Sequence, residues 1–299
     1  MNDQPEVQRH AESMTDADGT MPAQQQEPPG LTAQMDPVPD HGESSWEGRG
    51  RLEGLKALIT GGDSGIGAAT AVAFAREGAD VAIAYLPAEE TDAANVARII
   101  TESGQRVVQI PGDLMDPEYP TRVVEEAVRE LGGLDILVNN AAKQVAIEGL
   151  ADLSDDQLEE TFTANILSMF RLTRAALPHL QPGSSIINTT SIQAYQPSPT
   201  LLDYAATKAA INNFSKGLAE ELAAKGIRVN AVAPGPIWTA IQPSDGQPIE
   251  KLPDFGKDVG LGRAGQPTEL APAYVFLASS ESSYVLGATI HVNGGQPTP

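Results

Sequence analysis

Three residues in the second half of the chain carry side chains suited to proton transfer: Ser191, Tyr204 and Lys208. Tyr204 and Lys208 stand four positions apart, so on a helix their side chains share one face. A positive charge beside a phenol favours the phenolate and lowers the tyrosine pKa, which suits a general acid/base. Ser191 can polarise the same substrate oxygen. The tyrosine–lysine spacing alone is common, and its alternative reading is a tyrosine packed on a helix beside a solvated lysine.

A glycine-rich segment far upstream favours the catalytic reading. It reads Thr60-Gly61-Gly62-Asp63-Ser64-Gly65-Ile66-Gly67, after an apolar run at 57–59 and before a segment of helical composition at 68–77. Strand, glycine turn and helix together bind dinucleotides, because glycines allow close backbone approach and a helix N-terminus attracts the pyrophosphate. The spacing differs from the more familiar Gly-x-Gly-x-x-Gly, and a simple glycine-rich turn is the alternative.

Short apolar segments alternate with helical segments from residue 52 onward. Strands are expected near 56–60, 81–85, 106–110, 135–139, 185–190, 228–233 and 289–292, and helices near 65–77, 89–103, 117–131, 154–179, 203–225 and 268–279. This alternation predicts parallel βαβ units with right-handed crossovers. We therefore predict an α/β fold: a single doubly wound (Rossmann-type) domain, with a seven-stranded parallel sheet and helices on both faces. The motif residues fall at strand carboxyl ends, where such sheets bind ligands.

Together these motifs resemble the short-chain dehydrogenase/reductase family over roughly residues 52–295. Further matching motifs are Asp113-Leu114, Asn139-Asn140-Ala141-Ala142, Asn165, Pro234-Gly235 with Thr239, and Val292-Asn293-Gly294-Gly295. Ala142 departs from the glycine usual at that position. Gly50-Arg51-Leu52 and Tyr85-Leu86-Pro87 resemble a branch with a Pro-rich N-terminal arm, which includes bacterial stress-associated oxidoreductases and broad aldehyde reductases.

The resemblance implies an NAD(P)(H)-dependent oxidoreductase that transfers a hydride between nicotinamide and a small aldehyde, ketone or polyol. It implies that Tyr204 is the general acid/base, that Lys208 lowers its pKa and binds the nicotinamide ribose, and that Ser191 holds the substrate oxygen. Asn165 would relay protons through a water. The implied cofactor-binding residues are Gly61, Asp63, Ser64, Gly65, Ile66, Gly67, Tyr85, Leu86, Asp113, Leu114, Asn140, Ala141, Ala142, Tyr204, Lys208, Pro234, Gly235, Ile237 and Thr239. The resemblance also implies a homotetramer built on the helices near 154–179 and 203–225.

Cofactor preference and substrate stay open in the sequence. Tyr85 stands where NAD sites often carry an acid, which permits NADP, yet no basic residue adjoins it and Glu89 and Glu90 follow. Candidate substrate-lining residues are Lys143, Gln144, Gln193, Tyr195 and the loop 236–262, including Trp238. The glutamines suit a hydroxylated substrate such as a sugar, and are as readily explained as exposed loop residues. The segment 236–262 is long enough to close over a substrate as a lid.

Composition excludes several other functions. A net charge of −21, from 40 acidic and 19 basic residues, repels nucleic acids and anionic membranes, so neither is expected as a partner. The acidity fits solubility or adaptation to salt. The absence of cysteine excludes disulfides and thiolate metal sites, and the four histidines lack ligand spacing, so no metal is expected. Neither an apolar signal-peptide core nor a membrane-spanning run is present, which predicts a cytoplasmic protein.

Residues 1–50 are expected to form a polar, Pro-rich and largely irregular N-terminal arm, and residues 51–299 the NAD(P)-binding domain. The arm is too polar to fold alone. Apolar residues in its second half (Leu31, Met35, Val38 and Trp46) predict that residues 30–50 lie against the enzyme or a neighbouring subunit. Two alternatives to an enzyme remain: a dinucleotide-sensing binding protein on the same fold, and a stress-interaction protein that acts through its acidic arm.

Overall fold

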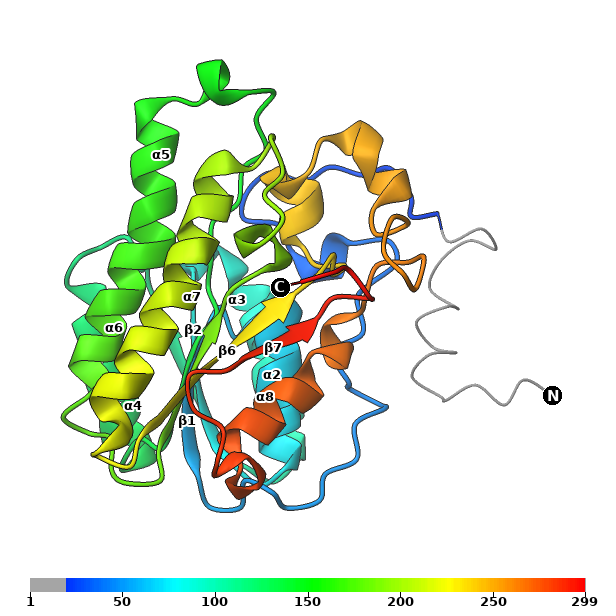
Figure 1. Cartoon of the computed structure of the whole chain (residues 1–299). Coiled ribbons are helices and arrows are strands. Elements are labelled where there is room, and N and C mark those ends of the chain that lie inside the picture. Colours follow the sequence, from blue (N-terminus) through cyan, green and yellow to red (C-terminus); the bar gives the residue numbers. More distant parts are fainter. Residues whose placement is uncertain (1–19, 299) are drawn as a thin grey trace.

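A computed structural model describes residues 20–298 as an α/β protein with a central parallel sheet between two layers of helices (Figure 1). The seven strands run in the order β3-β2-β1-β4-β5-β6-β7. They are β1 (Lys56–Thr60), β2 (Asp80–Tyr85), β3 (Val107–Pro111), β4 (Ile136–Asn139), β5 (Ser185–Thr189), β6 (Arg228–Pro234) and β7 (Thr289–Val292). The helices are α2 (Gly65–Arg76), α3 (Glu90–Glu102), α4 (Tyr119–Leu131), α5 (Asp155–Phe162), α6 (Ser168–Ala176), α7 (Leu202–Ala223) and α8 (Ala271–Ala278).

The sheet is buried on both faces, which explains why its strands read as continuous apolar runs. Helices α2, α3 and α8 contribute to one apolar cluster against the sheet, and α4, α6 and α7 to a second on the opposite face. The fold prediction is therefore confirmed, including the number of strands and their parallel direction. One element differs, because the helix expected at 154–179 is divided by a π-helical turn, Thr163–Leu167.

The strand order reverses direction beside β1, and this reversal positions the site. β1 pairs in parallel with β2 on one side and with β4 on the other. The crossover helices on the two sides therefore leave the sheet toward opposite faces, and a crevice opens beyond the carboxyl ends of the central strands. The glycine-rich turn after β1 and the segment after β4 both end in this crevice.

The N-terminal arm, taken as residues 20–50, lies against the domain of its own chain (Figure 1). Its one regular element is a short 3-10 turn, Thr32–Gln34. Met35 is buried in an apolar cluster with Trp238, and Trp46 packs at the edge of the main core, as expected of anchors. Val38 is half exposed, so it does not anchor the arm on the domain of its own chain.

Another anchor, Met21, was not expected from the sequence. It is buried in the same cluster as Met35. A single methionine in a polar segment gives no periodic signal in the sequence. Met21 is buried by residues of the domain, such as Trp238 and Leu252, which the sequence of the arm does not reveal.

Candidate active site

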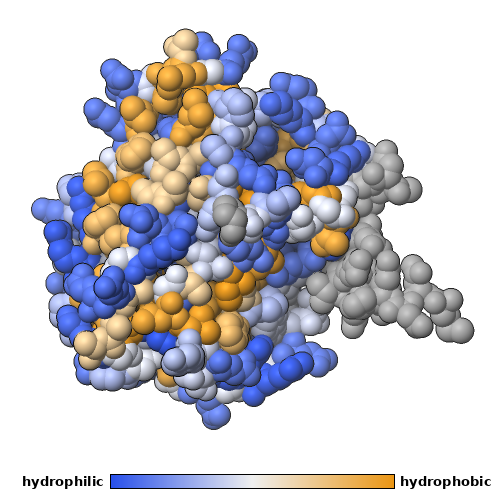
Figure 2. Space-filling model, viewed as in Figure 1, coloured by the Kyte–Doolittle hydropathy of each residue, from blue (hydrophilic) through white to orange (hydrophobic). Residues whose placement is uncertain are grey.

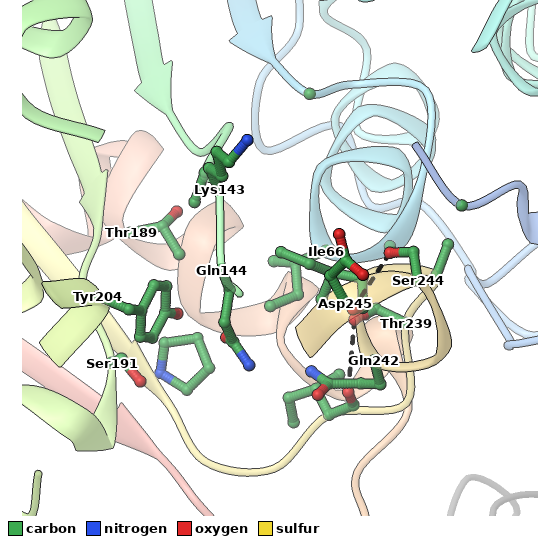
Figure 3. A pocket seen from close by; sticks show the side chains of 18 of the residues that line it. Ile66, Lys143, Gln144, Thr189, Ser191, Tyr204, Thr239, Gln242, Ser244 and Asp245 are labelled. Atoms are coloured by element: carbon green, nitrogen blue, oxygen red, sulfur yellow. Dashed lines mark hydrogen bonds between the residues drawn. The ribbon is translucent and has the colours of Figure 1, made fainter. Parts of the chain in front are cut away.

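The carboxyl ends of the strands line one large cavity of about 940 Å³, a size suited to a dinucleotide with a small substrate (Figure 3). Figure 3 shows Tyr204 and Ser191 on one side, Thr239 and Asp245 on the other, and Gln144 between them. The residues assigned to the cofactor from the sequence line this cavity with one exception, Gly67. That glycine lies in α2, where an added Cβ would come within 1.8 Å of the Gly61 carbonyl oxygen.

The turn between β1 and α2 has the features that a pyrophosphate site requires. Gly61 and Gly65 adopt positive φ angles of 62° and 51°, which side chains disfavour. α2 begins at Gly65, and the Ser64 side chain that precedes it makes no capping hydrogen bond. The first amides of the helix are therefore left for an anionic ligand, in the positive field of the helix N-terminus.

The three proton-transfer residues come together at one wall of the cavity. Ser191 caps the 3-10 turn Ile192–Ala194, where its hydroxyl accepts a hydrogen bond from the Gln193 amide at 3.1 Å. Lys208 is only 2% exposed, and its Nζ lies 5.3 Å from the centre of the Tyr204 ring. The same Nζ donates to the Thr189 carbonyl oxygen at 2.9 Å, which fixes the ammonium at the end of β5.

The pKa values of the pair are set by burial rather than by their mutual charge. Burial raises the pKa of Tyr204 to about 12, and a hydrogen bond with Ser191 only partly opposes this rise. Burial lowers the pKa of Lys208 to about 7. The expected lowering of the tyrosine pKa by the lysine is thus wrong for this arrangement, because desolvation disfavours both charged forms. At neutral pH Tyr204 is a neutral phenol, the state that donates a proton.

Asn165 does not line the cavity, but its side chain hydrogen-bonds with segments that do. It lies in the π-helical turn between α5 and α6. Its Nδ2 donates to the Lys143 carbonyl oxygen at 2.9 Å and to the Thr207 hydroxyl at 3.1 Å, while its Oδ1 accepts from the Lys143 amide at 2.7 Å. The side chain thereby links the segment after β4 to α7, close to Tyr204 and Lys208. π-turns of this kind are frequent at functional sites.

A buried carboxyl group lies in the cavity lining beside the glycine turn. Asp63 is 2% exposed, and neither of its carboxylate oxygens has a hydrogen-bond partner of good geometry, although the adjacent Ser64 hydroxyl stabilises the charge in part. Burial raises its pKa well above the ordinary value, with repulsion from Glu89 adding to the effect. A buried polar group without a partner indicates a place where a ligand hydroxyl can donate. The residues present therefore fit a dinucleotide.

Tyr85, the residue that replaces the usual acid after β2, is tied to the next helix. Its hydroxyl donates to Glu90 at 2.7 Å. Burial and this carboxylate hold the pKa of the phenol above its ordinary value. Tyr85 is therefore an uncharged lining group at the end of β2, beside the carboxyl groups of Asp63 and Glu89.

Two residues assigned to the substrate lie outside the cavity lining. Trp238 is fully buried among apolar side chains, and its Nε1 donates to the Pro37 carbonyl oxygen of the arm at 2.8 Å. The Tyr195 ring packs against His291, with 5.0 Å between ring centres. Both assignments are corrected, because each ring is used for packing.

The remaining substrate candidates line the cavity but also hold its loops in place. Gln144 donates to the Gly246 carbonyl oxygen at 2.8 Å, and Gln193 accepts from the Ser198 amide at 2.6 Å. The Lys143 Nζ pairs with Glu160 at 2.6 Å.

Several other lining residues come from the loop 236–262, which the sequence indicated as a whole, and from the arm, which it did not indicate. The loop 236–262, which holds a π-turn at Gln242–Gly246 and a 3-10 helix at Ile249–Asp254, contributes Gln242, Ser244 and Asp245. The arm contributes Pro28, Pro29 and Gly30. Only the Pro-Pro-Gly composition of that arm segment, which favours a fixed turn, could have drawn attention to it.

The described part of the chain, residues 20–298, contains no cluster of acidic and histidine side chains able to hold a metal ion. Over the same residues, no helix combines the length and the apolar character needed to cross a bilayer.

Comparisons with known proteins agree with this geometry. A family described as enoyl-(acyl carrier protein) reductase matches residues 61–296. The chain is 59% identical to the uncharacterized oxidoreductase YghA of Escherichia coli, over 93% of this chain and 95% of that protein. It is 48% identical to NADPH-dependent aldehyde reductase 1, chloroplastic, of Arabidopsis thaliana, over 89% of this chain and 94% of that protein.

Among solved structures, a short-chain dehydrogenase from Burkholderia cenocepacia in complex with NADP superposes with a TM-score of 0.77. It is 35% identical and covers 82% of this chain and 98% of its own. With the sheet order, the glycine turn and the Ser191–Tyr204–Lys208 arrangement, these matches establish that the chain belongs to the short-chain dehydrogenase/reductase family of NAD(P)-dependent oxidoreductases.

Proposed function

We propose that this protein interconverts a small carbonyl compound (an aldehyde or a ketone) and the corresponding alcohol or polyol, with Tyr204 as the general acid/base. The observation that carries the proposal is the meeting of Ser191, Tyr204 and Lys208 in a cavity whose other end is the glycine turn of α2. The similarity to an NADPH-dependent aldehyde reductase supports this substrate class.

In this mechanism the bound nicotinamide supplies or accepts the hydride. The uncapped start of α2 would hold the pyrophosphate and Asp63 a ribose hydroxyl, while Lys208 would reach the nicotinamide half. Tyr204, a neutral phenol at neutral pH, donates its proton to the carbonyl oxygen during reduction. Ser191 donates a hydrogen bond to the same oxygen and stabilises the negative charge that develops there. Asn165 acts as a positioning residue through Lys143 and Thr207.

The pKa of Lys208 predicts a falling pH profile for reduction. With a pKa of about 7, the Lys208 ammonium, which would bind the nicotinamide half of the cofactor, is present below pH 7 and lost above it. Tyr204, with a pKa of about 12, stays protonated throughout this range. We expect kcat/KM for reduction to fall about tenfold per pH unit well above the lysine pKa. A profile measured between about pH 5.5 and 9 tests this, and a flat one contradicts the role of the ammonium.

The function itself is tested by initial rates with NADH and NADPH, each against aldehydes, ketones, sugars and one enoyl thioester. Turnover of a carbonyl compound is expected with at least one dinucleotide, and identifies the preference that the sequence leaves open. The enoyl thioester serves as the discriminating substrate because the matched family carries that reductase's description. Reduction of that substrate alone would replace the carbonyl proposal.

The other two functions make different predictions in the same experiment. A dinucleotide-sensing protein would bind NADH or NADPH without turning over any substrate. A stress-interaction protein would need neither. Filled catalytic positions favour the enzyme, since Tyr204 and Lys208 line the cavity together.

We further propose that the chain is divided into an arm (1–50) and a catalytic domain (51–299), and that the protein acts in the cytoplasm. We also propose that it forms a homotetramer. Three large apolar side chains on or beside α5 and α6, Leu158, Leu167 and Phe170, are 37%, 46% and 49% exposed. Figure 2 shows apolar side chains gathered over this part of the surface. A patch of this kind favours contact with another subunit, and light scattering measures the number of subunits.

A further inference from the structure

The N-terminal arm runs along the rim of the cavity on its pyrophosphate side. Arm residues 28–30 line the cavity. Gly30 packs so tightly that an added Cβ would lie 2.5 Å from the Ala240 carbonyl oxygen. The residue before Ala240, Thr239, lies against the start of α2, where a Cβ added to Gly65 would be 3.0 Å from Thr239 Cγ2. Gly30 is therefore close to the helix N-terminus assigned to the pyrophosphate.

Two residues further on, the arm is attached to α3. The Thr32 amide donates to Oδ2 of Asp92 at 2.6 Å, and both residues are buried. Asp92 lies in the first turn of α3, which follows β2 and its cavity-lining last residue, Tyr85. A backbone bond to a carboxylate is stronger than one between neutral groups. The arm thus spans the crevice from the Ala240 side to α3.

The preceding part of the arm is attached to the loop 236–262. The Gln26 amide donates to the Pro243 carbonyl oxygen at 2.9 Å, and the Met21 amide donates to that of Pro253 at 3.4 Å. Figure 1 shows the arm, in dark blue, beside this loop, in gold. The arm therefore connects the loop 236–262, on one side of the cavity, with α3 on the other side.

We propose that arm residues 28–30, held in place by the backbone attachments at Gln26 and Thr32, form the outer wall of the dinucleotide site and retain the bound dinucleotide. This inference rests on the proposed function, since it assigns a wall to the same site. A dinucleotide lying between the α2 turn and the arm leaves only after the arm detaches from α3 or from the loop. The arm consequently raises the affinity for the dinucleotide and slows its release.

The attachment to α3 can be removed by one substitution, Thr32→Pro, which deletes the amide hydrogen that Asp92 accepts. Proline fits here because Thr32 begins a 3-10 turn and Leu31 before it is extended, with φ −103° and ψ 131°. We expect the Kd for the preferred dinucleotide to rise about tenfold or more, with faster dissociation in stopped-flow fluorescence. Thr32→Ala is the matched control, because it keeps the amide and should bind as the wild type does.

A second pair of variants tests the contact at Ala240. Gly30→Ala places a methyl group against the Ala240 carbonyl oxygen and should also weaken binding. Gly217→Ala, in α7, brings the added methyl group within 4 Å of no atom beyond the neighbouring backbone of its own helix, and it serves as the control. Circular dichroism and thermal midpoints confirm that each variant folds. In the wild type, hydrogen–deuterium exchange of the peptide that spans residues 26–32 should slow when the dinucleotide is added.

The outcomes separate this inference from the function on which it rests. Wild-type protein that binds neither NADH nor NADPH contradicts the proposed function. Wild-type protein that binds, while Thr32→Pro and Gly30→Ala bind equally well and arm exchange is unchanged, contradicts the arm's role alone. Weaker binding in these two variants, with both controls unaffected, supports it.

Discussion

Tyr204→Phe is expected to lower kcat for carbonyl reduction by about a thousandfold or more, while the dinucleotide still binds with wild-type affinity. Phenylalanine fills the same space and loses only the hydroxyl that donates the proton. Lys208 keeps its place, because it is held by the Thr189 carbonyl oxygen and not by the phenol. Ser191 remains to polarise the substrate, so some residual rate above the uncatalysed reaction is consistent with the mechanism.

The measurement is single-turnover reduction, with dinucleotide affinity determined separately from nicotinamide fluorescence. Tyr195→Phe is the matched control, since Tyr195 lies a few residues after Ser191 but packs on His291 outside the cavity lining. That variant should turn over normally. Wild-type-like turnover in Tyr204→Phe would exclude Tyr204 as the proton donor, and a parallel loss in Tyr195→Phe would point to damage of the loop instead.

Local signals account for the parts of the site that the sequence predicted. The glycines of the cofactor motif lie within a single loop, and Tyr204 and Lys208 lie within a single helix, so both motifs are visible as short spacings in the sequence. The ends of the strands are visible as the ends of apolar runs. The structure brings these segments to one edge of the sheet because parallel βαβ units place all strand carboxyl ends together. Fold class and the core of the site were predictable for this reason.

The features that the sequence did not predict depend on distant contacts. Trp238 looks like a pocket residue in its loop, yet it is covered by Pro37, which lies 201 positions earlier. The high pKa of Tyr204 follows from burial, which no spacing between tyrosine and lysine reveals. Asn165 bonds with the backbone of Lys143, 22 positions earlier, through a π-turn that interrupts an otherwise regular helical pattern.

Glu77 is another residue whose role depends on contacts distant in sequence, and its replacement is expected to destabilise the fold strongly. It follows α2 and is fully buried. Its carboxylate accepts from the Trp46 Nε1 at 3.2 Å, the Arg49 amide at 2.9 Å, and Arg51 through its amide at 3.1 Å and its guanidinium at 2.7 Å. In the sequence it is one of many acids at a helix end. In the fold it joins the arm to the domain.

Glu77→Ala should lower the free energy of unfolding by about 3–5 kcal/mol, because it leaves several buried donors and the Arg51 charge without a partner. Glu53→Ala is the control, since Glu53 is exposed, and should change it by less than about 0.5 kcal/mol. Urea unfolding at neutral pH measures the free energy of unfolding of both variants and of the wild type. Equal stability of the two variants would show that the arm attachment contributes little to the folded state.

The same carboxylate predicts how this contribution depends on pH. Burial alone would raise the pKa of Glu77, but Arg51 and the backbone donors outweigh it and hold the pKa at about 2, below its ordinary value of 4.5. A lowered pKa in the folded state means that the stabilisation is complete above pH 4.5 and disappears as the pH falls toward 2. The shift corresponds to about 3 kcal/mol. The stability difference between wild type and Glu77→Gln should therefore shrink across this window; a difference independent of pH would mean that the bonds do not require the charge.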